Sequence, residues 1–178
     1  MGALDSRPAT QLGTLLRALR LARDLSQADL AARLGRAQSV VSRWERGVLE
    51  PTPLDAVALC AALAVPLEAL LVAVPAVRGR RRTSRRDGSR DLALGRAVWE
   101  MRAELGLSPV AVARRAGLTP RRLRRIELGQ DPSLGELAGL SRGLGVAAGA
   151  LMGPKLDGLG DRTTVPAGPK PPPTPTAS

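Results

Sequence analysis

An internal repeat is the feature that most constrains how this chain of 178 residues can fold. When the sequence is shifted by 82 positions, two long segments align in register. Matches at leucine and arginine are common by chance in this composition, whereas matches at glycine, serine and glutamate are not. The aligned pairs are Leu12-Gly13 with Leu94-Gly95, Arg20 with Arg102, Leu25-Ser26 with Leu107-Ser108, Gly35 with Gly117, Glu45 with Glu127, Gly47 with Gly129 and, after a one-residue deletion, Leu59, Leu63, Val65 and Leu70 with Leu140, Leu144, Val146 and Leu151. The chain therefore contains two copies of one structural unit.

Each copy has the periodicity of a string of short helices. In the first copy, apolar residues recur at helical spacing from Leu12 to Leu19. Ser26 and Asp29 have the spacing of a capping box, which predicts a second helix that Gly35 ends. The other predicted segments are a third helix from about Gln38 to Arg46 that ends at Gly47, a fourth helix lined by Ala56, Val57, Leu59, Cys60 and Leu63, and a fifth helix that Pro66 opens and that ends at Leu71.

The second copy repeats this plan, and the pairs Ser108-Pro109 and Thr119-Pro120 combine a helix cap with a proline in the first turn. The sequence thus predicts an all-α fold of two five-helix units, over residues 12–71 and 92–152. Residues 72–91 form a basic linker that contains Gly and Ser. Residues 153–178 are rich in Pro, Gly and Thr, cannot bury a core, and are predicted to be disordered.

Composition narrows the fold and the partners. Phe and Tyr are absent, so the cores must be built from Leu, Val and Ala, which favours small helical bundles over β-sandwiches. The net charge is +11, of which residues 12–71 contribute +1, residues 72–91 contribute +5 and residues 92–152 contribute +4. A positive field of this size attracts polyanions, which are either nucleic acid or an anionic membrane surface. Charge alone does not choose between them.

Catalysis, cofactor binding and metal binding are not expected. The chain has no His and no Tyr, and Cys60, its one cysteine, lies on an apolar helix face, so the usual general bases, nucleophiles and metal ligands are missing. No apolar run reaches the roughly 18 residues of a membrane span. The N-terminal residues, which include Asp5, Arg7 and Pro8, lack the apolar core of a signal peptide. We therefore expect a cytoplasmic, nucleoid-associated protein. Binding to a membrane surface is less favoured than binding to DNA or to a protein partner.

The third predicted helix has two chemically different sides. Drawn as a wheel, it places Val40, Val41 and Trp44 on one side, with Glu45 at the edge. An isolated helix of this kind is most simply a solvated surface helix. Here it follows a capped short helix and a glycine turn, which is the order of a helix-turn-helix that reads the DNA major groove. The other side of the helix carries Gln38, Ser39, Ser42, Arg43 and Arg46.

Two stretches, Leu25–Gly35 and Gln38–Gly47, resemble the lambda-repressor/Cro-like (XRE-type) helix-turn-helix family. The resemblance covers residues 12–71 well and extends more weakly over residues 94–152. It implies the following roles: Gln27 holds the phosphate backbone, Gln38, Ser39 and Arg43 reach base edges, Ser42 and Arg46 touch sugar-phosphate, and the pairs Arg20–Glu45 and Arg102–Glu127 are ion pairs between the first and third helices of each unit.

The second unit departs from this pattern. Pro109 and Pro120 replace the two glutamines, and Leu128 replaces Arg46. Its third helix instead exposes Arg121, Arg124 and Arg125, which suit DNA contact, including sequence-independent phosphate binding. The alternative is a degenerate copy kept as a dimerisation or protein-docking surface. In the first unit, Ala37 stands where the family has a capping Ser or Thr, which costs roughly 1 kcal/mol of capping.

Two classes of function stay open at this stage. The first is sequence-specific binding of double-stranded DNA by a repressor-like transcriptional regulator. The rival is a protein-interaction role, such as an antitoxin or an adaptor whose second unit or tail docks a partner. Stoichiometry is open as well, because two chains can pair as a homodimer or the two units of one chain can form an intramolecular pseudo-dimer. Arginines of the linker either follow phosphates in a minor groove or belong to a soluble spacer.

Overall fold

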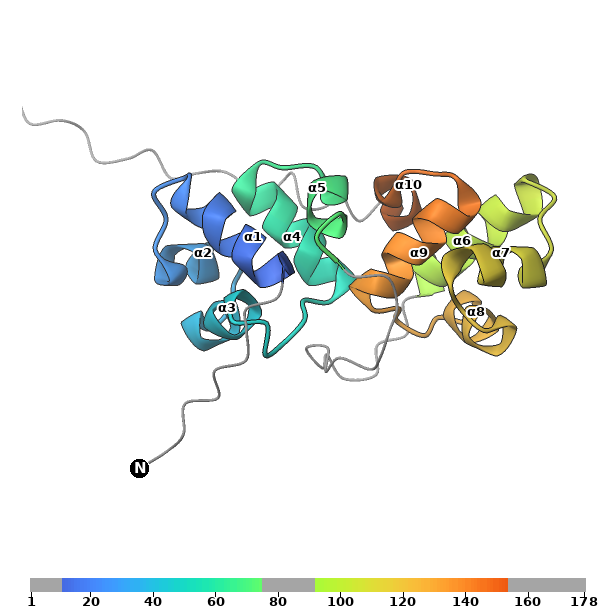
Figure 1. Cartoon of the computed structure of the whole chain (residues 1–178), viewed down its shortest axis with the longest axis horizontal. Helices are drawn as coiled ribbons and strands as arrows, with labels where there is room; N and C mark the ends of the chain where they lie inside the picture. The colour runs from blue at the N-terminus through green and yellow to red at the C-terminus, as the bar shows by residue number, and fades with distance from the viewer. Residues whose placement is uncertain (1–10, 75–91, 154–178) are drawn as a thin grey trace, which may run out of the picture.

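The computed structural model describes residues 11–74 and 92–153, and both segments are helical throughout their regular structure (Figure 1). Most of the predicted linker and nearly all of the predicted disordered tail lie outside these residues. The first unit contains α1 (Gln11–Leu21), α2 (Gln27–Arg33), α3 (Gln38–Glu45), α4 (Pro53–Leu63) and α5 (Leu67–Leu71). The second contains α6 (Leu92–Glu104), α7 (Pro109–Ala116), α8 (Pro120–Glu127), α9 (Leu134–Leu144) and α10 (Ala148–Met152). The prediction of two five-helix, all-α units is confirmed.

The start of α2 and the ends of α2 and α3 have the local chemistry that the sequence predicted. The Ser26 hydroxyl accepts the Asp29 backbone N–H, and the Asp29 carboxylate accepts the Ser26 N–H, so the capping box is closed. Gly35 and Gly47 follow α2 and α3 with φ of +60° and +68°, a left-handed conformation that glycine adopts at no steric cost. A tight turn therefore separates the two helices, and α3 stops abruptly.

Capping boxes also open α4 and α9, and the sequence analysis did not predict these two. Thr52 and Asp55 close the box of α4, and Ser133 and Glu136 close the box of α9. Both carboxylates accept an arginine from the helix-turn-helix of their own unit: Arg36 reaches Asp55, and Arg122 reaches Glu136. The start of the fourth helix of each unit is thus fixed to its helix-turn-helix by an ion pair.

A glycine in the first helix of each unit permits a close helix crossing. A Cβ added to Gly13 would lie 2.3 Å from the Glu45 backbone carbonyl oxygen, and a Cβ added to Gly95 would lie 2.5 Å from that of Ile126. Either contact is far inside van der Waals distance, so a larger residue would push α1 off α3, or α6 off α8. The repeated glycine is therefore required by the backbone approach and is not a turn signal.

The second unit has a further close approach, between α7 and α9. A Cβ added to Gly139 would lie 2.3 Å from the Ala116 carbonyl oxygen, and one added to Gly143 would lie 3.0 Å from the Ala116 backbone nitrogen. In the first unit Ala58 and Ala62 hold the corresponding positions, and α2 lies less close to α4. The two units share a plan but differ in how tightly the second helix packs on the fourth.

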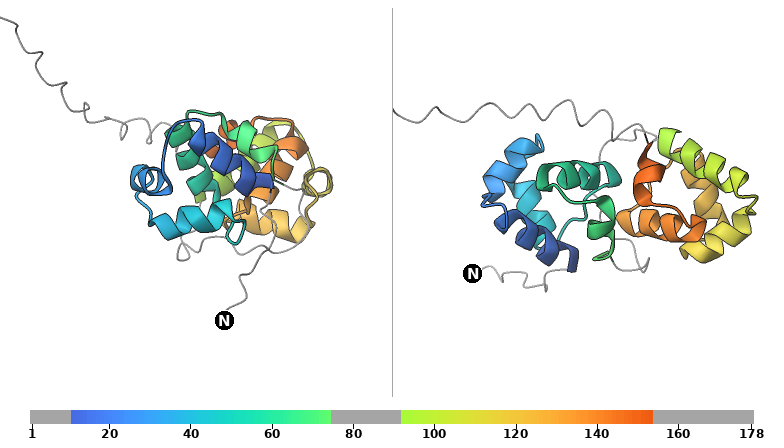
Figure 2. Two further views of the ribbon diagram at one scale, coloured as in Figure 1. Left: turned by 60° about the vertical axis from the view of Figure 1, so that its left-hand side comes forward. Right: turned by 90° about the horizontal axis from the view of Figure 1, so that it is seen from above.

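The two units pack against each other through their last helices. The helix α5 contacts α10, and both α4 and α5 contact α9. The buried side chains of the two units belong to one hydrophobic cluster, which includes Leu70 and Leu71 of α5 and Leu151 and Met152 of α10. Seen from above in Figure 2, the units are related by an approximate two-fold rotation: α1 and α6 lie at opposite corners, as do α4 and α9.

The third helices of the two units differ in capping, which predicts a difference in stability. Ala37 precedes α3 and makes no side-chain cap, whereas the Thr119 hydroxyl accepts the Arg122 backbone N–H at 3.1 Å. We expect Ala37→Thr to raise the free energy of unfolding by about 1 kcal/mol and Thr119→Ala to lower it by a similar amount. Urea denaturation followed by circular dichroism measures both. An unchanged stability in Ala37→Thr, with Thr119→Ala destabilised, would contradict the assignment of the missing cap at Ala37.

Candidate nucleic-acid interface

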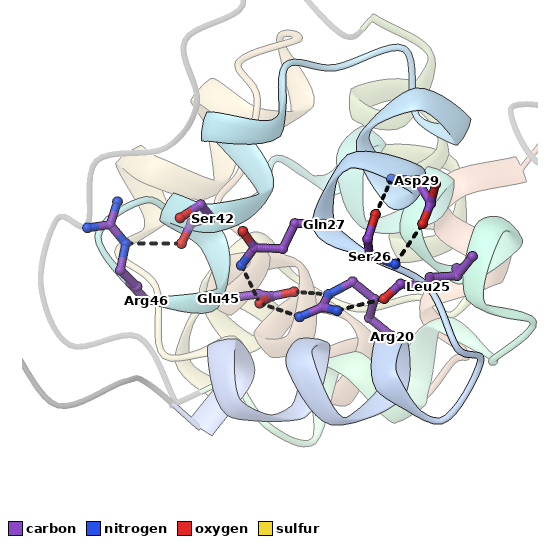
Figure 3. Close-up of polar contacts among 8 residues, drawn as sticks. All are labelled: Arg20, Leu25, Ser26, Gln27, Asp29, Ser42, Glu45 and Arg46. Atoms are coloured by element: carbon purple, nitrogen blue, oxygen red, sulfur yellow. Dashed lines mark hydrogen bonds and ion pairs between the residues drawn. The ribbon is translucent and has the colours of Figure 1, made fainter.

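A buried ion pair fixes α3 against α1. Arg20 Nε donates to Glu45 Oε1 at 2.6 Å, and Arg20 Nη2 donates to Glu45 Oε2 at 3.0 Å (Figure 3). Arg20 Nη1 also donates to the Leu25 carbonyl oxygen at 2.7 Å, where the chain leaves α1 for α2. The side chains of Arg20 and Glu45 are 7% and 4% exposed. Such a two-pronged pair orients the helices that it joins.

Gln27 extends this pair to α2. Its side-chain Nε2 donates to Glu45 Oε2 at 2.8 Å, and the residue is half-buried (Figure 3). The family resemblance implies that Gln27 holds a phosphate. An amide nitrogen carries two hydrogens, so one can hold Glu45 while the other points to a ligand. The arrangement thus gives Gln27 a fixed position at the start of α2.

The environment of Glu45 lowers its pKa. Burial alone would raise it, but hydrogen bonds from Arg20 and Gln27 and the positive charge of Arg20 outweigh that effect. Arg17, an exposed residue of α1, acts on Glu45 in the same direction. The pKa of Arg20 is raised by its hydrogen bond to Glu45, although burial opposes the rise. Both groups are therefore charged at neutral pH.

The two sides of α3 differ in exposure as their chemistry suggests. Val41 and Trp44 are 1% and 2% exposed and pack into the core. The predicted contact residues lie on the outer side, where Gln38, Ser39, Arg43 and Arg46 are exposed and Ser42 is half-buried.

The two arginines of this side lie along their own helix. Arg43 Nε donates to the Ser39 carbonyl oxygen at 3.2 Å, and Arg46 Nε donates to the Ser42 carbonyl oxygen at 3.3 Å (Figure 3 shows the second bond). Both side chains remain exposed. Their terminal nitrogens are the atoms that a base or phosphate would meet.

The second unit repeats this arrangement in a weaker form. Arg102 Nε donates to Glu127 Oε1 at 2.7 Å, and Arg102 Nη1 donates to the Leu107 carbonyl oxygen at 3.2 Å. These two side chains are more exposed than their counterparts, at 13% and 11%. Pro109 stands in the position of Gln27 and has no side-chain donor, so α7 is not tied to Glu127 in this way.

The arginines of α8 divide into two groups. Arg121, Arg124 and Arg125 are exposed, as the sequence suggested. Arg122 instead points inward to α9, where its Nε and Nη2 donate to the two carboxylate oxygens of Glu136 at 2.6 and 2.7 Å. It also donates to Gln130 and to the Asp131 backbone carbonyl. Three of the four arginines are thus available to a ligand, and the fourth is structural.

The helix-turn-helix family model matches residues 16–70 and residues 100–151, together more than half of the chain. The chain belongs to the lambda-repressor-like helix-turn-helix family. Both matches fall on the five-helix units, so this is a tandem helix-turn-helix protein of a DNA-binding, transcription-regulator type. A search of curated proteins finds no match.

The described part of this helix-turn-helix protein contains no group of His, Cys, Asp and Glu residues that could hold a metal ion. Cys60 is buried on α4, and burial, together with the charge of Glu68, raises the pKa of its thiol to about 12. A thiol with that pKa carries almost no thiolate at neutral pH and is a poor nucleophile. No helix within residues 11–74 and 92–153 is long and apolar enough to cross a membrane.

Some residues around the interface were missed by the sequence analysis. Arg17 is one, because it is exposed on α1 and acts electrostatically on the Arg20–Glu45 pair. Arg36 is another, since it joins the helix-turn-helix to Asp55. The Thr52…Asp55 and Ser133…Glu136 spacings could have predicted the capping boxes whose carboxylates accept Arg36 and Arg122. No local pattern marks the role of Arg17, because it depends on how α1 crosses α3.

The lowered pKa of Glu45 predicts a loss of stability in acid. The folded-state pKa lies below the ordinary value of 4.5, so this stabilisation is present above about pH 4.5 and is lost as the pH falls through the folded pKa. Glu136, whose pKa is also lowered, adds to the same effect. We expect the melting temperature to fall below pH 4.5, and the fall to be shallower in Glu45→Gln and shallower still when Glu136→Gln is added.

At neutral pH, Glu45→Gln should cost on the order of 1.5–3 kcal/mol, because hydrogen bonds to a charged partner are lost. Thermal unfolding between pH 3 and 7 measures both effects. A wild-type acid profile in the double variant would contradict the assignment of these two carboxylates.

Proposed function

We propose that this protein binds double-stranded DNA at specific sequences and regulates transcription in a repressor-like manner, with α3 in the major groove. The observation that carries the proposal is the free polar side of α3. Gln38, Ser39 and Arg43 are exposed, while Val41 and Trp44 hold the helix from behind. A helix locked in this way presents its side chains in a fixed geometry, as direct reading of bases requires.

The residue types suit base recognition. A glutamine side chain can pair bidentately with adenine, and an arginine side chain with the N7 and O6 atoms of guanine. Gln38 is the first residue of α3 and Ser39 the second, so both lie at the end of the helix that enters a groove first. Arg43 lies one turn further along the same side. These three residues are proposed to choose the base sequence.

Other polar groups would hold the sugar-phosphate backbone. Ser42 and Arg46 lie along the same exposed side of α3, and Gln27 lies at the start of α2. Contacts of this kind fix the register of the protein on the duplex and carry no sequence information themselves. The Gln27–Glu45–Arg20 chain of hydrogen bonds supports this division, because it fixes α2 and α3 relative to each other before DNA is met.

A second candidate function is docking of a protein partner through the second unit, as in an antitoxin or an adaptor. One specific observation favours it. At positions where the first unit has Arg17 and Arg46, the second has Trp99 and Leu128, which are 51% and 65% exposed. Exposed apolar side chains beside arginines are typical of protein interfaces. This function would use the second unit and leave α3 free for DNA.

Selection of bound fragments from random double-stranded DNA, at low and at moderate salt, tests the proposed function. We expect an enriched motif that persists at the higher salt, because base contacts discriminate after phosphate binding has weakened. A library that binds at low salt without any enriched motif would refute sequence-specific recognition.

Arg43→Ala should weaken binding to the selected site by about 1–3 kcal/mol, roughly 5- to 150-fold, and relax the base preference at one position. Arg33→Ala is the matched control, since it removes the same charge from an exposed residue at the far end of α2. We expect the control to keep the base preference and to change affinity only slightly. Equal effects of the two substitutions, in competition binding with point-mutated sites, would mean that Arg43 acts through charge alone.

A further inference from the structure

Because the two units pack against each other, their third helices, α3 and α8, lie on the same face of the molecule. The axis of the approximate two-fold rotation passes between α5 and α10, as the view from above in Figure 2 shows. In Figure 1, α3 and α8 both lie at the lower end of the molecule. Neither helix is covered by the other unit, since Arg43 of α3 and Arg124 of α8 are both exposed. Two recognition surfaces are thus presented side by side to one ligand.

The contact between the units involves buried residues of α9, a core helix of the second unit. The buried residues of α9 are Leu134, Gly135, Leu137, Ala138, Gly139, Leu140, Gly143 and Leu144. At 100° per residue these are spread around the helix, and Arg142 is the one exposed residue of α9. A helix that is buried on nearly every side needs cover beyond one neighbour. Its own unit supplies most of this cover, above all through α7, and the first unit supplies a smaller part through α4 and α5.

One polar contact joins the two units at the surface. The Gly149 backbone N–H donates to Glu68 Oε1 at 3.5 Å, which joins the start of α10 to α5 at an exposed position. Leu70 of α5 and Leu151 and Met152 of α10 are at most 3% exposed and belong to one hydrophobic cluster. Buried apolar area of this kind stabilises a packed arrangement in proportion to the area removed from water. The relative position of α3 and α8 is thereby set within one chain.

The two surfaces are chemically unequal. On α3, Gln38 and Ser39 can read bases, whereas the corresponding positions on α8 are Pro120 and Arg121. A proline has no side-chain donor or acceptor. The remaining groups on the exposed side of α8 are arginines, which suit phosphates of any sequence. One surface can select a sequence, and the other can hold a backbone.

We propose that a single chain occupies two successive half-sites on one face of a DNA duplex, and that the halves are used unequally. The first unit reads the sequence of its half-site through α3, and the second unit clamps the phosphates of the next half-site through Arg121, Arg124 and Arg125. The bound site is therefore non-palindromic, with sequence information in one half. This inference rests on the proposed function, because it needs a selected site.

The favoured occupant of the α8 surface is DNA and not a protein, for two reasons. First, α8 lies on the face that carries α3, so a duplex that lies along this face can reach both helices. Second, the exposed groups of α8 are three cations, and DNA carries a negative charge every ~1.7 Å of helix axis. The exposed Leu128 stands at the position of Arg46 and has no polar side-chain group. This agrees with a second half-site whose bases are not read.

The test uses the full chain on a duplex that carries the selected motif. Native mass spectrometry should give one chain per duplex. Hydroxyl-radical footprinting should show two protected backbone segments on one face, about one helical turn of ~10 base pairs apart. Changing the bases under the second segment should alter affinity by less than about threefold. Removing that segment from the duplex should weaken binding at least tenfold.

The triple variant Arg121→Ala, Arg124→Ala, Arg125→Ala tests the clamp. It should lose the second protected segment, keep the selected motif, and make the plot of log affinity against log salt less steep by about 2 to 3. The matched control removes three exposed arginines of the same unit outside α8, as Arg114→Ala, Arg115→Ala, Arg142→Ala, and should keep both protected segments. Circular dichroism checks that both variants are folded.

Several outcomes would overturn the inference while leaving the proposed function intact. Two chains per duplex with equal protection would mean a homodimer on a palindrome. One chain with a single protected segment, and an unchanged salt slope in the triple variant, would assign α8 to a protein partner. Enriched bases under both segments would show that both halves are read. Failure to select any motif would refute the proposed function itself.

Discussion

The crossing of α1 over the end of α3, closed by Arg20 and Glu45, is the contact on which the rest of the first unit depends. Gly13 lets the two backbones approach, and Arg20 then reaches Glu45 with two nitrogens and the Leu25 carbonyl with a third. These bonds fix which side of α3 faces α1. The exposed side of α3 is therefore a consequence of what is buried behind it, including an ion pair whose side chains are 7% and 4% exposed.

The comparison of the units shows how few residues change the character of such a surface. The second unit keeps the glycine crossing and the ion pair as Gly95, Arg102 and Glu127. It loses the amide that would join the second helix to the pair, because Pro109 stands there. The framework is thus retained while the polar groups that it presents are exchanged. Duplication followed by this kind of exchange gives one chain two related surfaces with different chemistry.

The contact between the units adds a constraint that neither unit has alone. Apolar residues of α5 and α10 are buried, and α9 lies between its own unit and the first. Two copies on a flexible tether would have to find their relative orientation on each binding event, at a cost in entropy. When the two copies pack against each other, this entropy is lost during folding and not on binding. The packing of the two units therefore contributes to binding, as the exposed arginines do, because it fixes the relative position of α3 and α8.

Much of the fold could be predicted because its signals are local. The capping box of Ser26 and Asp29, the glycines that end α2 and α3, and the repeat itself depend on spacing along the chain, and the described helices follow them. The uncapped start of α3 at Ala37 was likewise visible in the sequence. Gln38, Ser39, Arg43, Arg121, Arg124 and Arg125 were proposed from helix periodicity, and the structure places all six at exposed positions.

Contacts between segments far apart in the chain could not be predicted in the same way. The inward turn of Arg122 to Glu136, the bond from Gln27 to Glu45 and the close approach of Gly139 to Ala116 depend on where other helices lie. Helix periodicity says which side of a helix a residue occupies, but it does not say what packs there. The sequence by itself determined the helices, the duplication and the outward residues of α3 and α8. Only the tertiary structure decided that both of these helices share one face, because that follows from the packing of α5 and α10.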